Sequence, residues 1–109
     1  MSLSASKLGK EILAALKGSL ADKWPDIKEY GESEAKKLAH TLVMIDALTA
    51  SGKIDKEQAR LHLEIQKNAT RTVLLTLEGL GILTVEDAIN AALKAVKDTV
   101  NTSVGFALL

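Results

Sequence analysis

His40 and His62 are the two side chains of this sequence best suited to acid–base or metal chemistry near neutral pH. A carboxylate di-iron bundle uses Glu-x-x-His on two helices, but Lys37 and Ala59 stand three residues before the two histidines. The sequence also lacks a His-x-x-x-His pair for a helical zinc site and a Gly-x-Ser-x-Gly turn for a serine nucleophile. The absence of cysteine excludes disulfides, thiolate metal sites and cysteine nucleophiles. We therefore expect no catalytic residue, no metal and no cofactor, and we favour a protein that is not an enzyme.

His62 still stands out, because it projects into the apolar side of its helical segment, with Gln66 one turn later. Asp46 lies at the edge of the apolar stripe of the preceding segment. A chain folded back at Gly52 brings Asp46 to within about 4 to 5 Å of His62 along the helix axis. An unpaired buried polar group costs about 1 to 3 kcal/mol, so we expect His62, Asp46 and Gln66 to form a buried hydrogen-bonded group. Such a group would fix helix register, and a small metal site centred on His62 is the alternative.

Apolar residues recur with a period near 3.6 almost throughout, and no segment alternates as a strand would. The pattern predicts four helices, over about 4–22, 25–50, 55–79 and 84–104. Pro25 separates the first two, because the residue before a proline avoids helical dihedral angles. Gly31 costs about 1 kcal/mol relative to alanine, which leaves open a kink or a later start near Ser33. Short connections make consecutive helices antiparallel, so we expect an all-α, up-down antiparallel bundle of about four helices, with residues 1–109 as one domain.

Two of the predicted connections share a residue pattern. Segments 52–59 and 81–88 both read Gly, any residue, aliphatic, cap, any residue, Glu, polar, Ala. We expect each glycine to close the preceding helix in a left-handed conformation, and Asp55 and Thr84 to cap the following helices. Gln58 stands where a capping box would return the hydrogen bond. Both segments are too short for a calcium loop and follow no strand, so the pattern indicates helix corners.

The third predicted helix has an unusually wide apolar face. At about 100° per residue its charged residues fall on one narrow stripe, formed by Arg60, Glu64, Lys67, Arg71 and Glu78. The remaining arc, about 220° of the circumference, is apolar or small, whereas a surface helix ordinarily buries about 100°. Either this helix is central in the monomer, or part of the arc is a subunit interface.

An apolar tail, residues 105–109, follows the last predicted helix and is unfavourable in water unless it docks. Four helices of this size do not easily cover both the tail and the wide third helix, so we expect a homo-oligomer, with a dimer as the default. The expected interface lies on the third and fourth helices and the tail: Val73, Leu77, Leu80, Val100, Val104, Phe106, Leu108 and Leu109. The predicted function is that of a non-enzymatic helical bundle that self-associates or binds a helical protein partner.

The charge balance and the distribution of apolar residues exclude other classes. Fourteen basic residues match fourteen acidic ones, so the chain lacks the positive excess of a general nucleic-acid binder. No apolar run approaches the roughly 18 to 20 residues of a membrane span, and the N-terminus lacks a secretory pattern, so we expect a cytoplasmic protein without a transmembrane segment. Residues 4–24 form a basic amphipathic stretch of the kind that lies on membranes. Docking on the bundle explains the same stretch and is favoured, with peripheral lipid binding as the alternative.

Overall fold

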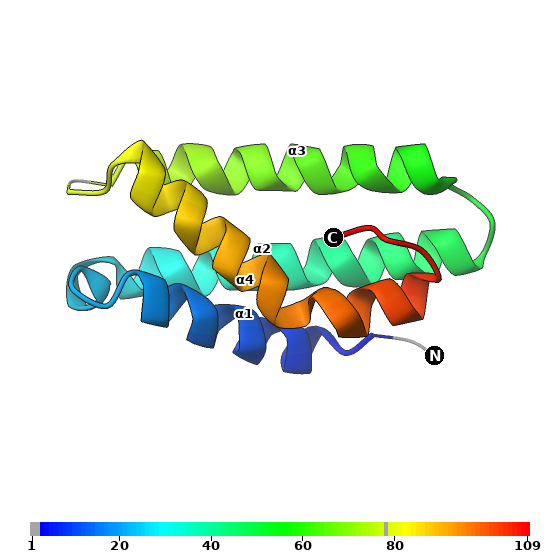
Figure 1. Cartoon of the computed structure of the whole chain (residues 1–109), viewed down its shortest axis with the longest axis horizontal. Coiled ribbons are helices and arrows are strands. Elements are labelled where there is room, and N and C mark those ends of the chain that lie inside the picture. The colour runs from blue at the N-terminus through cyan, green and yellow to red at the C-terminus, as the bar shows by residue number, and fades with distance from the viewer. Residues whose placement is uncertain (1–2, 78) are drawn as a thin grey trace.

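The structure, a computed structural model, describes residues 3–77 and 79–109. These residues form four helices, α1 (Ala5–Ser19), α2 (Trp24–Ala50), α3 (Lys56–Leu75) and α4 (Ile82–Val104). No strand occurs in this part of the chain, and the all-α four-helix prediction is confirmed. Figure 1 shows α1, α2 and α3 alternating in direction, as predicted, whereas α4 crosses the bundle obliquely from the end of α3 toward α1.

The core is aliphatic apart from Trp24 and is centred on α1, α2 and α4. The apolar face of α1 is buried against the bundle through Leu8, Ile12 and Leu16. α3 packs mainly against α2, meets α4 less extensively and does not touch α1. Its buried apolar side chains are Ala59, Leu63 and Leu74. α3 is therefore a peripheral helix, and the wide apolar arc predicted for it is not enclosed by the subunit.

Gly31 does not interrupt α2, which is one helix from Trp24 to Ala50. A Cβ atom placed on Gly31 would lie 2.5 and 2.6 Å from two ring carbons of Trp24. Such distances are far inside van der Waals contact, so the buried indole ring packs over a position that only glycine leaves open. Gly31 lowers the helix propensity of α2, but it allows the aromatic ring of Trp24 to be buried.

The first of the two similar corners forms as predicted. Gly52 adopts a left-handed conformation, with φ of +74°. The Asp55 carboxylate accepts a hydrogen bond from the N–H of Gln58 at 2.8 Å, and the N–H of Asp55 donates to the Gln58 side-chain oxygen at 3.0 Å. This reciprocal pair is the predicted capping box at the start of α3.

The second corner differs from its prediction. α3 ends at Leu75 and not near residue 79, and the left-handed glycine is Gly79, with φ of +86°. Gly81 is the N-cap of α4, so Thr84 lies inside the helix and caps nothing. Leu80 is buried in this connection. The chain leaves the helix early enough to insert that leucine into the core, and burial outweighs the local cap pattern.

The C-terminal tail folds back into the wedge between α3 and α4 (Figure 1). Gly105 ends α4 in a left-handed conformation, with φ of +86°. The Asn101 side-chain oxygen accepts hydrogen bonds from the N–H groups of Leu108 at 3.0 Å and Leu109 at 2.9 Å. The Asn101 amide nitrogen also donates to the carbonyl oxygen of Leu109 at 3.3 Å. One side chain thus fixes the backbone of the tail, with Leu108 buried beneath it.

The residues expected at a subunit interface lie largely inside the subunit. Leu80, Val100, Val104 and Leu108 are buried, and Val73, Leu77, Phe106 and Leu109 are half-buried. The Phe106 ring is further covered by Lys56 and Arg60 of α3, at 5.8 and 5.6 Å from its centre. The subunit itself therefore covers four of these side chains fully and the other four in part, because oblique α4 leaves a wedge that the tail enters.

Candidate functional site

The structure does not join His62, Asp46 and Gln66 into one hydrogen-bonded group. Asp46 is buried and accepts hydrogen bonds from the N–H of Leu3 at 3.2 Å and from the Ser103 hydroxyl at 2.9 Å. It therefore ties the N-terminal segment and α4 to α2. His62 lies half-buried on α3, and within residues 3–77 and 79–109 no hydrogen bond connects it to Asp46 or Gln66. The rotation of α2 explains the difference, because Asp46 faces α4 and not α3.

Gln66 instead belongs to a polar seam between α2 and α3. The Thr41 hydroxyl donates to the Gln66 side-chain oxygen at 3.3 Å, and the Gln66 amide donates to the Thr70 hydroxyl oxygen at 3.1 Å. Thr70 is fully buried. One hydrogen bond, from Thr41 to Gln66, therefore joins α2 to α3, and the bond from Gln66 to Thr70 within α3 holds the Gln66 side chain in place.

The described part of the chain contains neither a cluster of metal ligands nor a membrane-spanning helix. No three His, Asp or Glu side chains converge there as metal ligands would. The metal alternative at His62 therefore has no ligand set among these residues. None of the helices is both long and apolar enough to cross a bilayer over the residues described.

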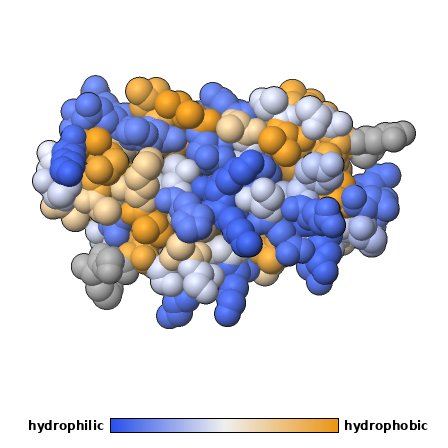
Figure 2. All heavy atoms as spheres, turned by 180° about the vertical axis from the view of Figure 1, so that it is seen from behind, coloured by the Kyte–Doolittle hydropathy of each residue, from blue (hydrophilic) through white to orange (hydrophobic). Residues whose placement is uncertain are grey.

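The outer face of α3 carries an apolar stripe that nothing in the subunit covers. We call Leu61, Ile65, Asn68, Thr72 and Leu75 the outer stripe; all five are exposed. Leu61 is 61% exposed, Ile65 60% and Leu75 39%. Figure 2 shows apolar side chains along the upper edge of the molecule, over α3, interspersed with polar ones.

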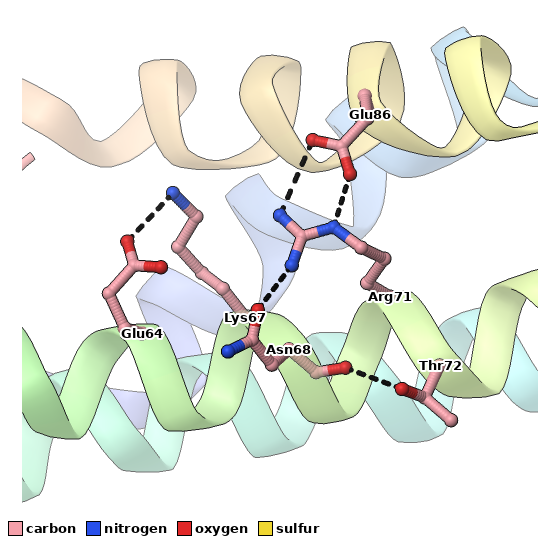
Figure 3. Close-up of polar contacts among 6 residues, drawn as sticks. All are labelled: Glu64, Lys67, Asn68, Arg71, Thr72 and Glu86. Atoms are coloured by element: carbon pink, nitrogen blue, oxygen red, sulfur yellow. Dashed lines mark hydrogen bonds and ion pairs between the residues drawn. The ribbon is translucent and has the colours of Figure 1, made fainter.

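The spacing of the outer stripe is that of a coiled-coil seam. Its members follow one another at intervals of four, three, four and three residues, with β-branched Ile65 and Thr72 alternating with the leucines and Asn68. None of the five is charged. The two polar members are satisfied within the helix, because the Thr72 hydroxyl donates to the Asn68 carbonyl oxygen at 2.9 Å and the Asn68 side chain accepts from Arg71 (Figure 3).

The wide arc of α3 therefore consists of two stripes with different surroundings. The inner stripe, which includes Leu63, Gln66 and Thr70, faces α2, and the outer stripe faces solvent. Sequence analysis identified the arc but not the outer stripe, because the interface residues that it expected on this helix, Val73 and Leu77, are half-buried. The signal that separates the two stripes is the heptad spacing of the outer one, which runs from Leu61 to Leu75.

The charged stripe of α3 faces α4, as Figure 3 shows. Arg71 forms a two-point ion pair with Glu86 of α4, in which its Nη2 donates to Oε2 at 3.3 Å and its Nε donates to Oε1. The hydrogen bond from Arg71 lowers the pKa of Glu86, and the same bond raises the pKa of Arg71. Lys67 pairs with Glu64 at 3.4 Å. Glu78, predicted for this stripe, lies outside the described residues.

No protein-family model, no curated protein and no solved structure matches this chain. Functional inference therefore rests on the geometry of the chain itself.

Proposed function

We propose that this protein is a non-enzymatic helical-bundle protein that self-associates, with the outer stripe of α3 docked against the same stripe of a second copy. One observation carries the proposal. Leu61 and Ile65 are each about three-fifths exposed at the start of an uncharged stripe with heptad spacing. Large aliphatic side chains held in water at that spacing favour a helical partner that buries them.

A second copy suits this stripe better than a charged partner does. Two identical uncharged stripes meet without like-charge repulsion, and a twofold axis makes the surface self-complementary. The whole chain is also neutral, with fourteen basic and fourteen acidic residues, so two copies approach without net repulsion at neutral pH.

The size of the stripe predicts a weak dimer. α3 has 20 residues and therefore spans about 30 Å. A standard stable interface buries about 800 Å² on each partner, more than one helical stripe supplies, so we expect a dissociation constant in the micromolar range or weaker. Because the bundle already holds α3 helical, association does not have to order it.

Sedimentation velocity at protein concentrations from the low micromolar to the millimolar range tests the proposal. We expect the unmodified chain to shift from monomer to dimer, and Ile65→Lys to remain monomeric, because a charge enters the seam. Leu83→Lys is the matched control, since Leu83 is 77% exposed and lies on α4, outside the stripe. A monomer at all concentrations, or equal loss of the dimer in both variants, contradicts the proposal.

The alternatives receive less support from the geometry. Lipid binding through residues 4–24 would require α1 to undock, because its apolar face is buried in the core. A cytoplasmic location and the absence of nucleic-acid binding remain predictions, which cell fractionation and binding at low salt would test.

A further inference from the structure

A groove separates α3 from α4 on the side away from the outer stripe. The Arg71–Glu86 ion pair joins the two helices (Figure 3). The helices diverge along the bundle, and the C-terminal tail lies at the wide end of the gap (Figure 1). The space between them, which we call the α3–α4 groove, has a volume of about 400 Å³. The groove is open to solvent on one side, so a ligand lying in it would remain partly exposed.

The floor of the α3–α4 groove is aliphatic and comes from three parts of the chain. It is formed by Leu63 of α3, Leu93 of α4, and Leu108 and Leu109 of the tail. The hydrogen bonds of Asn101 hold the backbone of the two tail leucines in place. The floor therefore exists before any ligand arrives, which reduces the entropic cost of binding.

The rim of the groove is cationic. Lys67, Lys94 and Lys97 line it, together with Asn90 and one acidic side chain, Glu64. Lys67 already pairs with Glu64 at 3.4 Å. Lys94 and Lys97 are exposed and form no ion pair with any residue that the structure describes. Two unpaired ammonium groups, 3 residues apart on one face of α4, thus stand beside a leucine floor.

We propose that the α3–α4 groove binds a single, non-micellar molecule of a medium-chain fatty acid. The acyl chain lies on the leucine floor, and the carboxylate lies between Lys94 and Lys97. An aliphatic floor with a few polar groups at its edge is the usual composition of a site for an amphiphile. The α4 segment from Asn90 to Lys97 rises about 10 Å, which limits the acyl chain to a short one. No aromatic side chain lines the groove, so it offers no stacking surface for a base or a sugar.

Titration of the full-length chain with sodium decanoate, kept below its micelle concentration, tests this proposal by amide NMR. We expect saturable shifts at Leu63, Leu93 and Leu108 and little change in α1. The double variant Lys94→Gln/Lys97→Gln should bind decanoate about three- to ten-fold more weakly, because each lost contact is a solvent-exposed ion pair. The matched control is Lys17→Gln/Lys28→Gln, which removes the same charge from lysines outside the groove and should bind as the unmodified chain does.

Three results would overturn the proposal. The first is the absence of a saturable response to decanoate, including the case in which the protein binds only phosphatidylglycerol vesicles. The second is equal affinity of the groove variant and the control variant. The third is equal affinity for decanoate and for decan-1-ol, because an uncharged head group gives the lysines nothing to pair with. The groove and the outer stripe occupy different sides of α3, so dimerisation and decanoate binding are tested separately.

Discussion

Because Gly31 contacts the Trp24 ring, Gly31→Ala and Gly18→Ala should have opposite effects on the stability of the protein. Helix propensity alone predicts that Gly31→Ala stabilises α2 by about 1 kcal/mol. A Cβ atom there would stand 2.5 Å from the indole ring, so we expect a loss of about 1–3 kcal/mol from overpacking. Gly18 of α1 is the matched control, since a Cβ atom there meets nothing within 4 Å, and Gly18→Ala should stabilise by about 0.5–1 kcal/mol.

Urea unfolding measures both changes, and the fluorescence of the single tryptophan reports the cause. We expect the native emission of Gly31→Ala to shift to the red, because the displaced ring becomes more exposed to water. Equal stabilisation by the two alanines, with unchanged emission, would show that the ring does not require the glycine.

For individual residues, the hydrogen-bond partners of polar side chains were the feature that the sequence predicted least well. The sequence places Asp46, His62 and Gln66 at suitable levels on neighbouring helices, and a buried hydrogen-bonded group was the reasonable inference. Asp46 is buried, but it bonds to Ser103, 57 residues away, because α2 turns that edge toward α4. Periodicity gives the face on which a residue lies. It does not give which neighbouring helix that face meets.

Among the helices, the Arg71–Glu86 ion pair joins α3 to α4. The pKa of Glu86 is lowered in the folded state from its ordinary value of 4.5, by the hydrogen bond from Arg71. The pair therefore stabilises the fold above that ordinary value, and its contribution is lost as the pH falls through the lowered pKa. Glu86→Gln removes the charge, so we expect its urea midpoint to be lower than that of the unmodified chain at pH 7. At pH 3 we expect the difference between the two midpoints to be smaller.

Urea midpoints of the two proteins at several pH values between 3 and 7 decide this prediction. Glu64→Gln is a suitable control, because Glu64 pairs with Lys67 within α3 and does not join two helices. A gap between Glu86→Gln and the unmodified chain that stays constant across this range would mean that the ion pair contributes nothing to stability.

The helices themselves could be predicted well, because their apolar periodicity is long and regular. The Asp55–Gln58 capping box followed directly from residue types and spacing. The end of α3 and the start of α4 did not. There, burial of Leu80 shifts both boundaries relative to the glycine pattern, and a contact distant in space overrides a local signal.

For the whole molecule, the oblique path of α4 decides which apolar surface stays exposed. An evenly packed antiparallel bundle would enclose α3 and leave the tail outside. Here the tail fills the wedge beside α3, and the outer stripe remains in water. The amount of apolar surface was visible in the sequence. Its location depends on a crossing angle that hydrophobic periodicity does not encode.

The helix dipoles favour an antiparallel dimer, because an antiparallel pair of α3 helices sets the two dipoles in opposite directions. Leu61 of one copy then packs at the level of Thr72 of the second copy.

Disulfide trapping tests the contact between two α3 helices directly, because the chain contains no cysteine of its own. Leu61→Cys and Thr72→Cys are mixed and oxidised at high protein concentration, with Leu83→Cys as the exposed control. We expect more mixed disulfide between the two stripe variants than disulfide-linked dimer of either variant alone or of the control. Dominant Leu61→Cys self-linkage would contradict the antiparallel orientation, and trapping no greater than in the control would contradict association through the outer stripe.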